Sequence, residues 1–161
     1  MRIRSGRAGD AARLAVILAE PGVRRWWRTP DPPRKIAPRF RGADGRSLFV
    51  VEVDGEVAGG VEYYEVDVPD YRSAGIDIFL GAAWQDRGVG TRVVRRMAAF
   101  LFDERGHHRI TIDPAAANSR AIATYEKVGF RPVGVMRGYE RGEDGTYHDG
   151  LLMDLLRDEL R

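Results

Sequence analysis

Two glycines stand two residues apart in the segment "AAWQDRGVGTRVV", where the chain begins a helical pattern. In a helix, Gly88 and Gly90 are each less favourable than alanine by about 1 kcal/mol. The first turn of a helix carries unpaired backbone N–H groups and a partial positive charge. Because glycine has no side chain to keep an anion away from these donors, the pair is compatible with binding of a pyrophosphate. A plain tight turn explains such a pair about as often.

Asp77 is a carboxylate inside the apolar run "GIDIFLG", which predicts a strand in the centre of a sheet. A carboxylate at such a position needs a partner or an opening in the sheet. Two interpretations have equal weight at this point. Asp77 forms a buried ion pair with an arginine, or it attracts the ammonium group of a substrate and accepts its proton.

Three polar residues lie at the end of the next predicted strand, "RITID", or beyond it, and each has a structural explanation. Asp113 ends that strand before Pro114, which is typical of a residue that caps the turn into a helix. Asn118 stands where a helix through "NSRAIATYEKV" would begin, so it is a candidate cap as well. Tyr125 follows Ala121 by four residues, which predicts an aromatic side chain in the core.

Charges of opposite sign are separated along the chain, although the formal net charge is only +2. The range 52–77 holds eight acidic residues and one basic residue, and the range 87–109 holds six arginines and two acidic residues. This separation is typical of two binding regions of opposite sign, or of ordinary solvated faces. Glu62 and, more weakly, Glu65 are candidates for attracting a polycation. Trp26 and Trp27 are either core residues or a wall of a substrate cleft.

Composition restricts the class of protein. At 161 residues the chain is most simply one domain, 1–161, and its 43% hydrophobic content is ordinary for a globular protein. The absence of cysteine excludes disulfides and thiolate sites, and the three histidines lack zinc-site spacing, so no metal is expected. The N-terminus has neither a signal peptide nor a membrane span, which predicts a cytoplasmic protein. The basic pI of about 9.1 would suit nucleic-acid binding, but no dedicated motif accompanies it.

Hydrophobic periodicity predicts an α/β domain with a mixed sheet. The expected order is a strand, two helices, three strands, a helix, a strand, a helix and two strands. Residues 28–46, with four prolines, are expected to form a surface loop.

The pattern Gln85-x-x-Gly88-x-Gly90, after an apolar strand and before an amphipathic helix, resembles the acyl-CoA pyrophosphate loop of the GNAT acyltransferase superfamily. The segment "DPAAANSRAIATYEKVGF" resembles the second conserved region of that family. This resemblance implies the GNAT fold over the whole chain. A mixed, mostly antiparallel sheet of about six to seven strands would be flanked by about four helices, with acetyl-CoA as the acyl donor.

The resemblance also implies a role for each candidate residue. Tyr125 would be the general acid for the leaving thiolate, and Asp77 the base or the anchor of the amine. The expected cofactor-binding residues are Phe79, Gln85, Arg87, Gly88, Val89, Gly90, Thr91 and Asn118. The expected substrate-binding residues are Trp26, Trp27, Glu62, Asp77 and Asp113.

Three short segments, "VRRWW", "GID" and "IDPAAAN", resemble the aminoglycoside 6'-N-acetyltransferases. They imply acetyl transfer to a primary amine of a cationic small molecule, by a monomer or homodimer that binds neither nucleic acid nor membrane. The segment between "YYEV" and "GID" is short and lacks a tryptophan-rich acidic stretch. Acetylation of a protein N-terminus, a lysine or another metabolite amine is therefore an alternative, and a CoA-binding regulatory domain is the non-enzymatic one.

Overall fold

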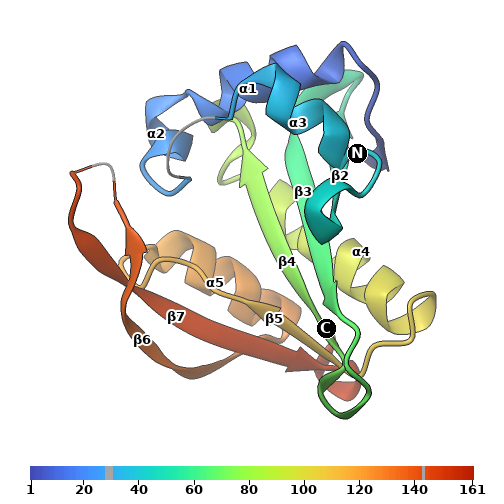
Figure 1. Ribbon diagram of the computed structural model, residues 1–161, viewed down its shortest axis with the longest axis vertical. Coiled ribbons are helices and arrows are strands. Elements are labelled where there is room, and N and C mark those ends of the chain that lie inside the picture. Colours follow the sequence, from blue (N-terminus) through green and yellow to red (C-terminus); the bar gives the residue numbers. More distant parts are fainter. Residues whose placement is uncertain (28–30, 143) are drawn as a thin grey trace.

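The computed structural model describes residues 1–27, 31–142 and 144–161, and its centre is one seven-stranded sheet. The strands are β1 Arg2–Ser5, β2 Arg46–Val53, β3 Glu56–Val66, β4 Ser73–Leu80, β5 Arg109–Ile112, β6 Arg131–Arg141 and β7 Tyr147–Leu156. Their order across the sheet is β1-β2-β3-β4-β5-β7-β6 (Figure 1). Neighbouring strands are antiparallel except β4 and β5, which are parallel. This mixed, mostly antiparallel sheet confirms the predicted fold class.

Five α-helices cover the sheet in the described ranges: α1 Asp10–Leu18, α2 Pro21–Arg24, α3 Pro33–Arg39, α4 Val89–Asp103 and α5 Ser119–Val128. Within those ranges, no helix combines the length and the apolar composition that crossing a membrane requires. The N-terminal helices lie together at one end of the molecule, at the top of Figure 1, whereas α4 and α5 lie farther down the sheet.

Two apolar clusters pack on opposite faces of the sheet, because successive strand residues point to opposite sides. On one face, Leu14 of α1 packs in a cluster with Val50 of β2 and Phe79 of β4. On the other face, residues of α4 such as Leu101 belong to a cluster that includes Ile76 of β4. Because Ile76 and Phe79 belong to different clusters, β4 contributes to both cores, as β2 does through Val50 and Val51.

The pairing of β4 with β5 covers two positions, Ala74 with Ile110 and Gly75 with Thr111. Beyond Gly75 the two strands diverge, as Figure 1 shows, while β4 stays paired with β3 as far as Leu80. Pro114 lies two residues after the end of β5 and has no N–H to continue a ladder. The second half of β4 therefore has one edge without a neighbouring strand, and Asp77 lies on that half.

The predicted loop over residues 28–46 is wrong for most of its described part. The segment contains α3 and a short 3-10 turn at Ala43–Gly45, whereas residues 28–30 lie outside the described ranges. The loop was predicted from the four prolines of this segment. Pro33, however, is the first residue of α3, where a fixed φ and a missing N–H are favourable. Ile36 is 1% exposed in the cluster around α1, and this tertiary contact holds the short helix in place.

We expect Gly129→Ala to lower the free energy of unfolding by about 1 to 3 kcal/mol. Gly129 ends α5 with a φ of +119°, and an added Cβ would lie 2.1 Å from the carbonyl oxygen of Glu159. Urea denaturation measures the change. Gly134→Ala is the matched control, because its added Cβ meets nothing within 4 Å. Equal effects of the two substitutions would show that the close approach at Gly129 is unimportant.

Candidate active site

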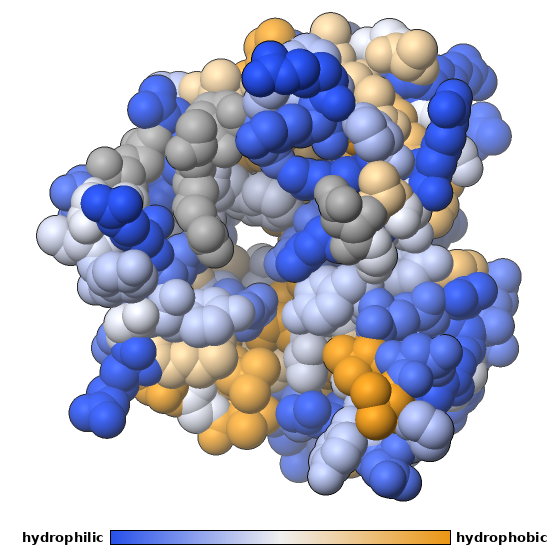
Figure 2. Space-filling model, viewed as in Figure 1, coloured by the Kyte–Doolittle hydropathy of each residue, from blue (hydrophilic) through white to orange (hydrophobic). Residues whose placement is uncertain are grey.

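An open cleft of about 920 Å³ lies where β4 and β5 part. Its walls come from the segment after α2, from β3 and β4, from the start of α4, and from α5 and β6. Figure 2 shows this hollow between the surface formed by the N-terminal helices and the surface formed by the β6–β7 region.

The start of α4 forms the first wall, with Gly88, Gly90 and Thr91. Gly88 caps the helix with a φ of +69°, a conformation that glycine adopts without strain. At Gly90, by contrast, an added Cβ would make an ordinary contact of 3.5 Å with Thr124 Cγ2. The backbone therefore accounts for Gly88, whereas the fold itself does not require glycine at position 90. The first turn also contains no acidic residue that would oppose an anion.

The other residues predicted for this loop have their side chains engaged elsewhere. Gln85 donates from Nε2 to the carbonyl oxygen of Leu80 at 2.8 Å, so it ties the loop to the end of β4. The guanidinium of Arg87 lies over the ring of Trp84 at 5.1 Å. The side chain of Val89 is 2% exposed and belongs to the core. Val89 can therefore contact a ligand through its main chain but not through its side chain.

Asp77 lies just beyond the last residue pair of β4 with β5, and its side chain is 26% exposed. Its Oδ2 accepts a hydrogen bond of 2.6 Å from Nη1 of Arg46, the first residue of β2. Burial raises the pKa of Asp77 to about 6, although the Arg46 hydrogen bond lowers it, and the charge of Glu62 adds to the increase. The pairing with an arginine is therefore confirmed, whereas the role of Asp77 toward a substrate amine stays a prediction that its position in the cleft allows.

Glu62 lies opposite Asp77 in the β3–β4 pairing, and its side chain is 3% exposed. Its Oε1 accepts a hydrogen bond of 2.9 Å from the same Arg46 nitrogen, and its Oε2 accepts one of 3.4 Å from Arg39 of α3. Arg39 is also paired with Asp31. A continuous chain of ion pairs therefore runs along the side of the cleft formed by β2, β3 and α3.

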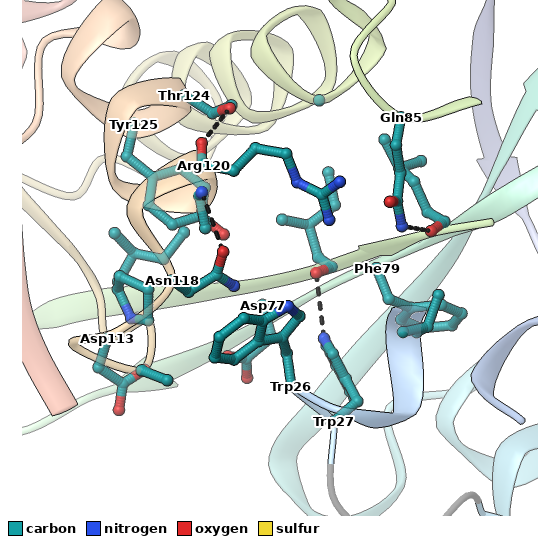
Figure 3. A pocket seen from close by; sticks show the side chains of 18 of the residues that line it. Trp26, Trp27, Asp77, Phe79, Gln85, Asp113, Asn118, Arg120, Thr124 and Tyr125 are labelled. Carbon is teal, nitrogen blue, oxygen red and sulfur yellow. Dashed lines mark hydrogen bonds between the residues drawn. The ribbon is translucent and has the colours of Figure 1, made fainter. Parts of the chain in front are cut away.

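Two residues of the α5 region face the same cleft, as Figure 3 shows. Tyr125 is 7% exposed and packs against the ring of Phe130, with centroids 6.1 Å apart. Burial raises the pKa of Tyr125, and the charges of Asp77 and Asp113 add to the increase, so the hydroxyl stays protonated near neutral pH. Asn118 caps α5 through a 3.2 Å hydrogen bond to the Ala121 N–H, as its spacing predicted.

Asp113 lies on the far side of the cleft from Trp27 in Figure 3. Its Oδ2 accepts a hydrogen bond of 2.5 Å from the hydroxyl of Tyr139 on β6. The predicted capping role is therefore corrected, because Asn118 rather than Asp113 caps α5. The pairing with Tyr139 instead holds a third carboxylate at the cleft, in addition to those of Asp77 and Glu62.

The two tryptophans differ in what surrounds them. Trp27 packs edge-on against Phe79, with ring centroids 4.9 Å apart, and donates from Nε1 to the Ile78 carbonyl at 3.2 Å (Figure 3). Phe79 itself is 5% exposed, so its side chain is part of the core. Trp26 lines the cleft and has the Arg25 guanidinium 4.7 Å from its ring centroid.

Sequence reasoning missed Arg46, Tyr64 and Tyr139, all of which line the cleft. A carboxylate within β4 signals that a cation must lie nearby, but a chain with 26 basic residues offers no way to choose which one. Glu65, the weaker candidate for polycation binding, pairs with Arg105 at 2.8 Å and with His107 at 2.7 Å near the start of β5.

A family model described as acetyltransferase (GNAT) domain matches residues 7–137. The chain belongs to the GNAT acetyltransferase family. It is accordingly an acetyltransferase, and acetyl-CoA is its cosubstrate. The glycine-lined start of α4 fits such a ligand, because it presents helix N–H groups where a phosphate binds favourably.

The relatives of this acetyltransferase act on different amines. It is 27% identical to the aminoglycoside N(6')-acetyltransferase type 1 of Klebsiella pneumoniae, over 79% of this chain and 72% of that protein. It is 30% identical to the spermidine N(1)-acetyltransferase of Escherichia coli K12, over 65% of this chain and 55% of that one. Among solved structures, AAC(6')-Ib in complex with paromomycin and acetyl-CoA is 26% identical, with a TM-score of 0.78 over 98% of this chain and 93% of that chain.

We expect Asp77→Asn to make the acetyltransferase more stable than wild type at pH 8 and to lose this advantage near pH 4. The folded state raises the pKa of Asp77 to about 6 from its ordinary 3.8, so ionisation of Asp77 costs stability as pH rises through this window. The difference in the free energy of unfolding between Asp77→Asn and wild type should grow by about 1 to 3 kcal/mol from pH 4 to pH 8. Urea titrations at several pH values measure this, with the exposed Asp70→Asn as control. A pH-independent difference would contradict the burial of this charge.

Proposed function

We propose that this acetyltransferase transfers the acetyl group of acetyl-CoA to a primary amine of a cationic small molecule, as an aminoglycoside 6'-N-acetyltransferase does. The observation that carries the proposal is Asp77, a carboxylate with a pKa of about 6 at the unpaired edge of β4. It shares one cleft with a glycine-lined helix start and with a protonated tyrosine.

The coenzyme would bind along the start of α4 and the unpaired edge of β4. The N–H groups around Gly88, Gly90 and Thr91 would hold the pyrophosphate, because a helix N-terminus attracts anions. The amide nitrogen of Asn118 would contact the pantetheine arm, since the capping bond of Asn118 engages only its oxygen. The main chain of β4 near Phe79 would pair with the arm as a neighbouring strand does.

Gly90→Ala tests the coenzyme site. The substitution should raise the free energy of unfolding by about 0.5 to 1 kcal/mol, because alanine favours a helix over glycine and has room here. It should weaken coenzyme A binding by about tenfold, because its methyl group separates phosphate from the N–H groups. Calorimetry and urea denaturation measure the two effects. Gly9→Ala, at the N-cap of α1 and outside the residues that line the cleft, is the control for coenzyme binding. Unchanged affinity in Gly90→Ala would place the pyrophosphate elsewhere.

The chemistry requires a neutral amine and a leaving group that gains a proton. Acetyl-CoA supplies an acetyl thioester. Asp77 takes the proton of the bound ammonium, and its raised pKa makes it a stronger base than an ordinary carboxylate. The C–N bond forms as the C–S bond breaks, and the hydroxyl of Tyr125 gives its proton to the thiolate sulfur. The second proton that the nitrogen loses as it becomes an amide then restores the hydroxyl of Tyr125.

The charge of the cleft supports a cationic acceptor. Asp77, Glu62 and Asp113 contribute three carboxylates, which attract ammonium groups and hold them near Asp77. Trp26 adds an aromatic face that suits a cation or a sugar. The aminoglycoside and spermidine acetyltransferases among the relatives act on such amines. Protein amines are the alternative, and they are tested in the same assay.

An acetyl-CoA consumption assay with ribostamycin, spermidine and short peptides tests the proposal. We expect turnover with the small cationic amines, and a decrease in kcat of about 10²-fold or more in Asp77→Asn and in Tyr125→Phe. Tyr139→Phe is a control that removes a cleft hydroxyl without touching the proposed acid. Turnover of peptides alone would favour the alternative. Equal rates in wild type and in both variants would show that Asp77 and Tyr125 do not carry the chemistry.

A further inference from the structure

A cation of the protein itself occupies the position between Asp77 and Glu62. Nη1 of Arg46 donates to Asp77 Oδ2 at 2.6 Å and to Glu62 Oε1 at 2.9 Å. A single nitrogen bonded to two carboxylates is the arrangement that a primary ammonium group would adopt at the same place. An acceptor amine that delivers its proton to Asp77 needs this position.

The hydrogen bonds of Arg46 to Asp77 and Glu62 can be broken by a competing cation. Its side chain is 39% exposed, whereas that of Glu62 is 3% exposed. Within the described part of the chain, both hydrogen bonds of Arg46 come from Nη1, and neither Nε nor Nη2 has a partner. The guanidinium rests on the ring of Tyr64, 4.8 Å from its centroid, and enters the cleft from the first residue of β2. Because the guanidinium end of both pairs is open to the cleft, Arg46 can leave the two carboxylates without crossing the core.

We propose that Arg46 is an internal stand-in for the ammonium group of the acceptor. In the free enzyme its guanidinium fills the site between Asp77 and Glu62, and the acceptor amine displaces it into the open cleft. This inference rests on the proposed function, which places the amine at Asp77. Asp77 is then paired with a cation both before and after the acceptor binds, until it accepts the proton of the bound ammonium.

Because Arg46 is part of the chain at the cleft, it can influence which amines the enzyme accepts. A side chain attached to the cleft competes with a free amine at a high effective concentration. An acceptor with one ammonium group must displace this cation by a single contact. An acceptor with several ammonium groups also gains contacts at other carboxylates, such as Asp113. Arg46 therefore discriminates against monoamines and in favour of polycationic acceptors.

Arg46→Gln tests the stand-in. The KM for butylamine should fall by about two- to fivefold, which corresponds to a pair worth up to about 1 kcal/mol. The KM for spermidine should fall less, and the KM for acetyl-CoA should not change. The acidic limb of kcat/KM, near pH 6 in wild type, should move to higher pH. Arg46 lowers the pKa of Asp77, whereas burial and the charges of Glu62 and Asp113, which raise it, remain in the variant.

Two further variants control the experiment. Arg46→Lys keeps a cation at the site, so its pH profile should stay at the wild-type position. Arg2→Gln removes one positive charge from an exposed position on β1, and it should leave all three KM values unchanged. Circular dichroism and thermal unfolding establish that each variant is folded, and Arg46→Met, which also removes the cation, carries the test if Arg46→Gln does not fold.

The possible outcomes separate this inference from the proposed function. A wild-type enzyme that acetylates cationic amines, with an unchanged or higher amine KM in Arg46→Gln, would overturn the stand-in alone. Selective loss of acceptors that carry a carboxylate would overturn it too, and would make Arg46 an anion anchor. If wild type acetylates no amine, the proposed function fails. Calorimetry with spermidine and coenzyme A then decides the inference, because tighter spermidine binding by Arg46→Gln supports the stand-in and equal binding refutes it.

Discussion

The separation of β4 from β5 beyond Gly75 is the constraint on which the site depends. A strand buried in a continuous sheet cannot accommodate a carboxylate without a large desolvation cost. On the unpaired half of β4, Asp77 is buried enough to have a raised pKa and open enough to meet a ligand. The same opening leaves main-chain groups of β4 available, and it brings α4 and α5 to the two sides of one cleft.

Opposite electrostatic preferences meet at this opening. The start of α4 has a partial positive charge, no acidic residue in its first turn and glycines at two positions, all of which favour an anion. The side formed by β3 and the β5–α5 connection carries the carboxylates of Glu62 and Asp113, which favour a cation. The anionic coenzyme and the cationic amine of the proposed function would thus enter the cleft from different sides, each next to groups of opposite charge.

The ion pairs among Asp77, Glu62, Arg46 and Arg39 give the cleft a second level of organisation. Two carboxylates that face each other across β3 and β4 would favour protonation of one of them. Arg46 opposes this by donating to both, and its exposure makes the arrangement compatible with exchange for a substrate cation. The Arg46 side chain therefore pairs with both carboxylates in the free protein, and under our proposal it also selects among acceptor amines.

The sequence by itself determined the strands, the helices from Val89 and from Ser119, and the glycine-rich helix start, because periodicity and local backbone preferences act over a few residues. It also placed Asn118 as a cap and Asp77 on a central strand. Only the tertiary structure decided that the segment with Pro33 is helical, since the burial of Ile36 stabilises α3. It also decided which arginine pairs with Asp77. Arg46 lies 31 residues away in the chain, and the two come together because β2 and β4 both flank β3 in the sheet.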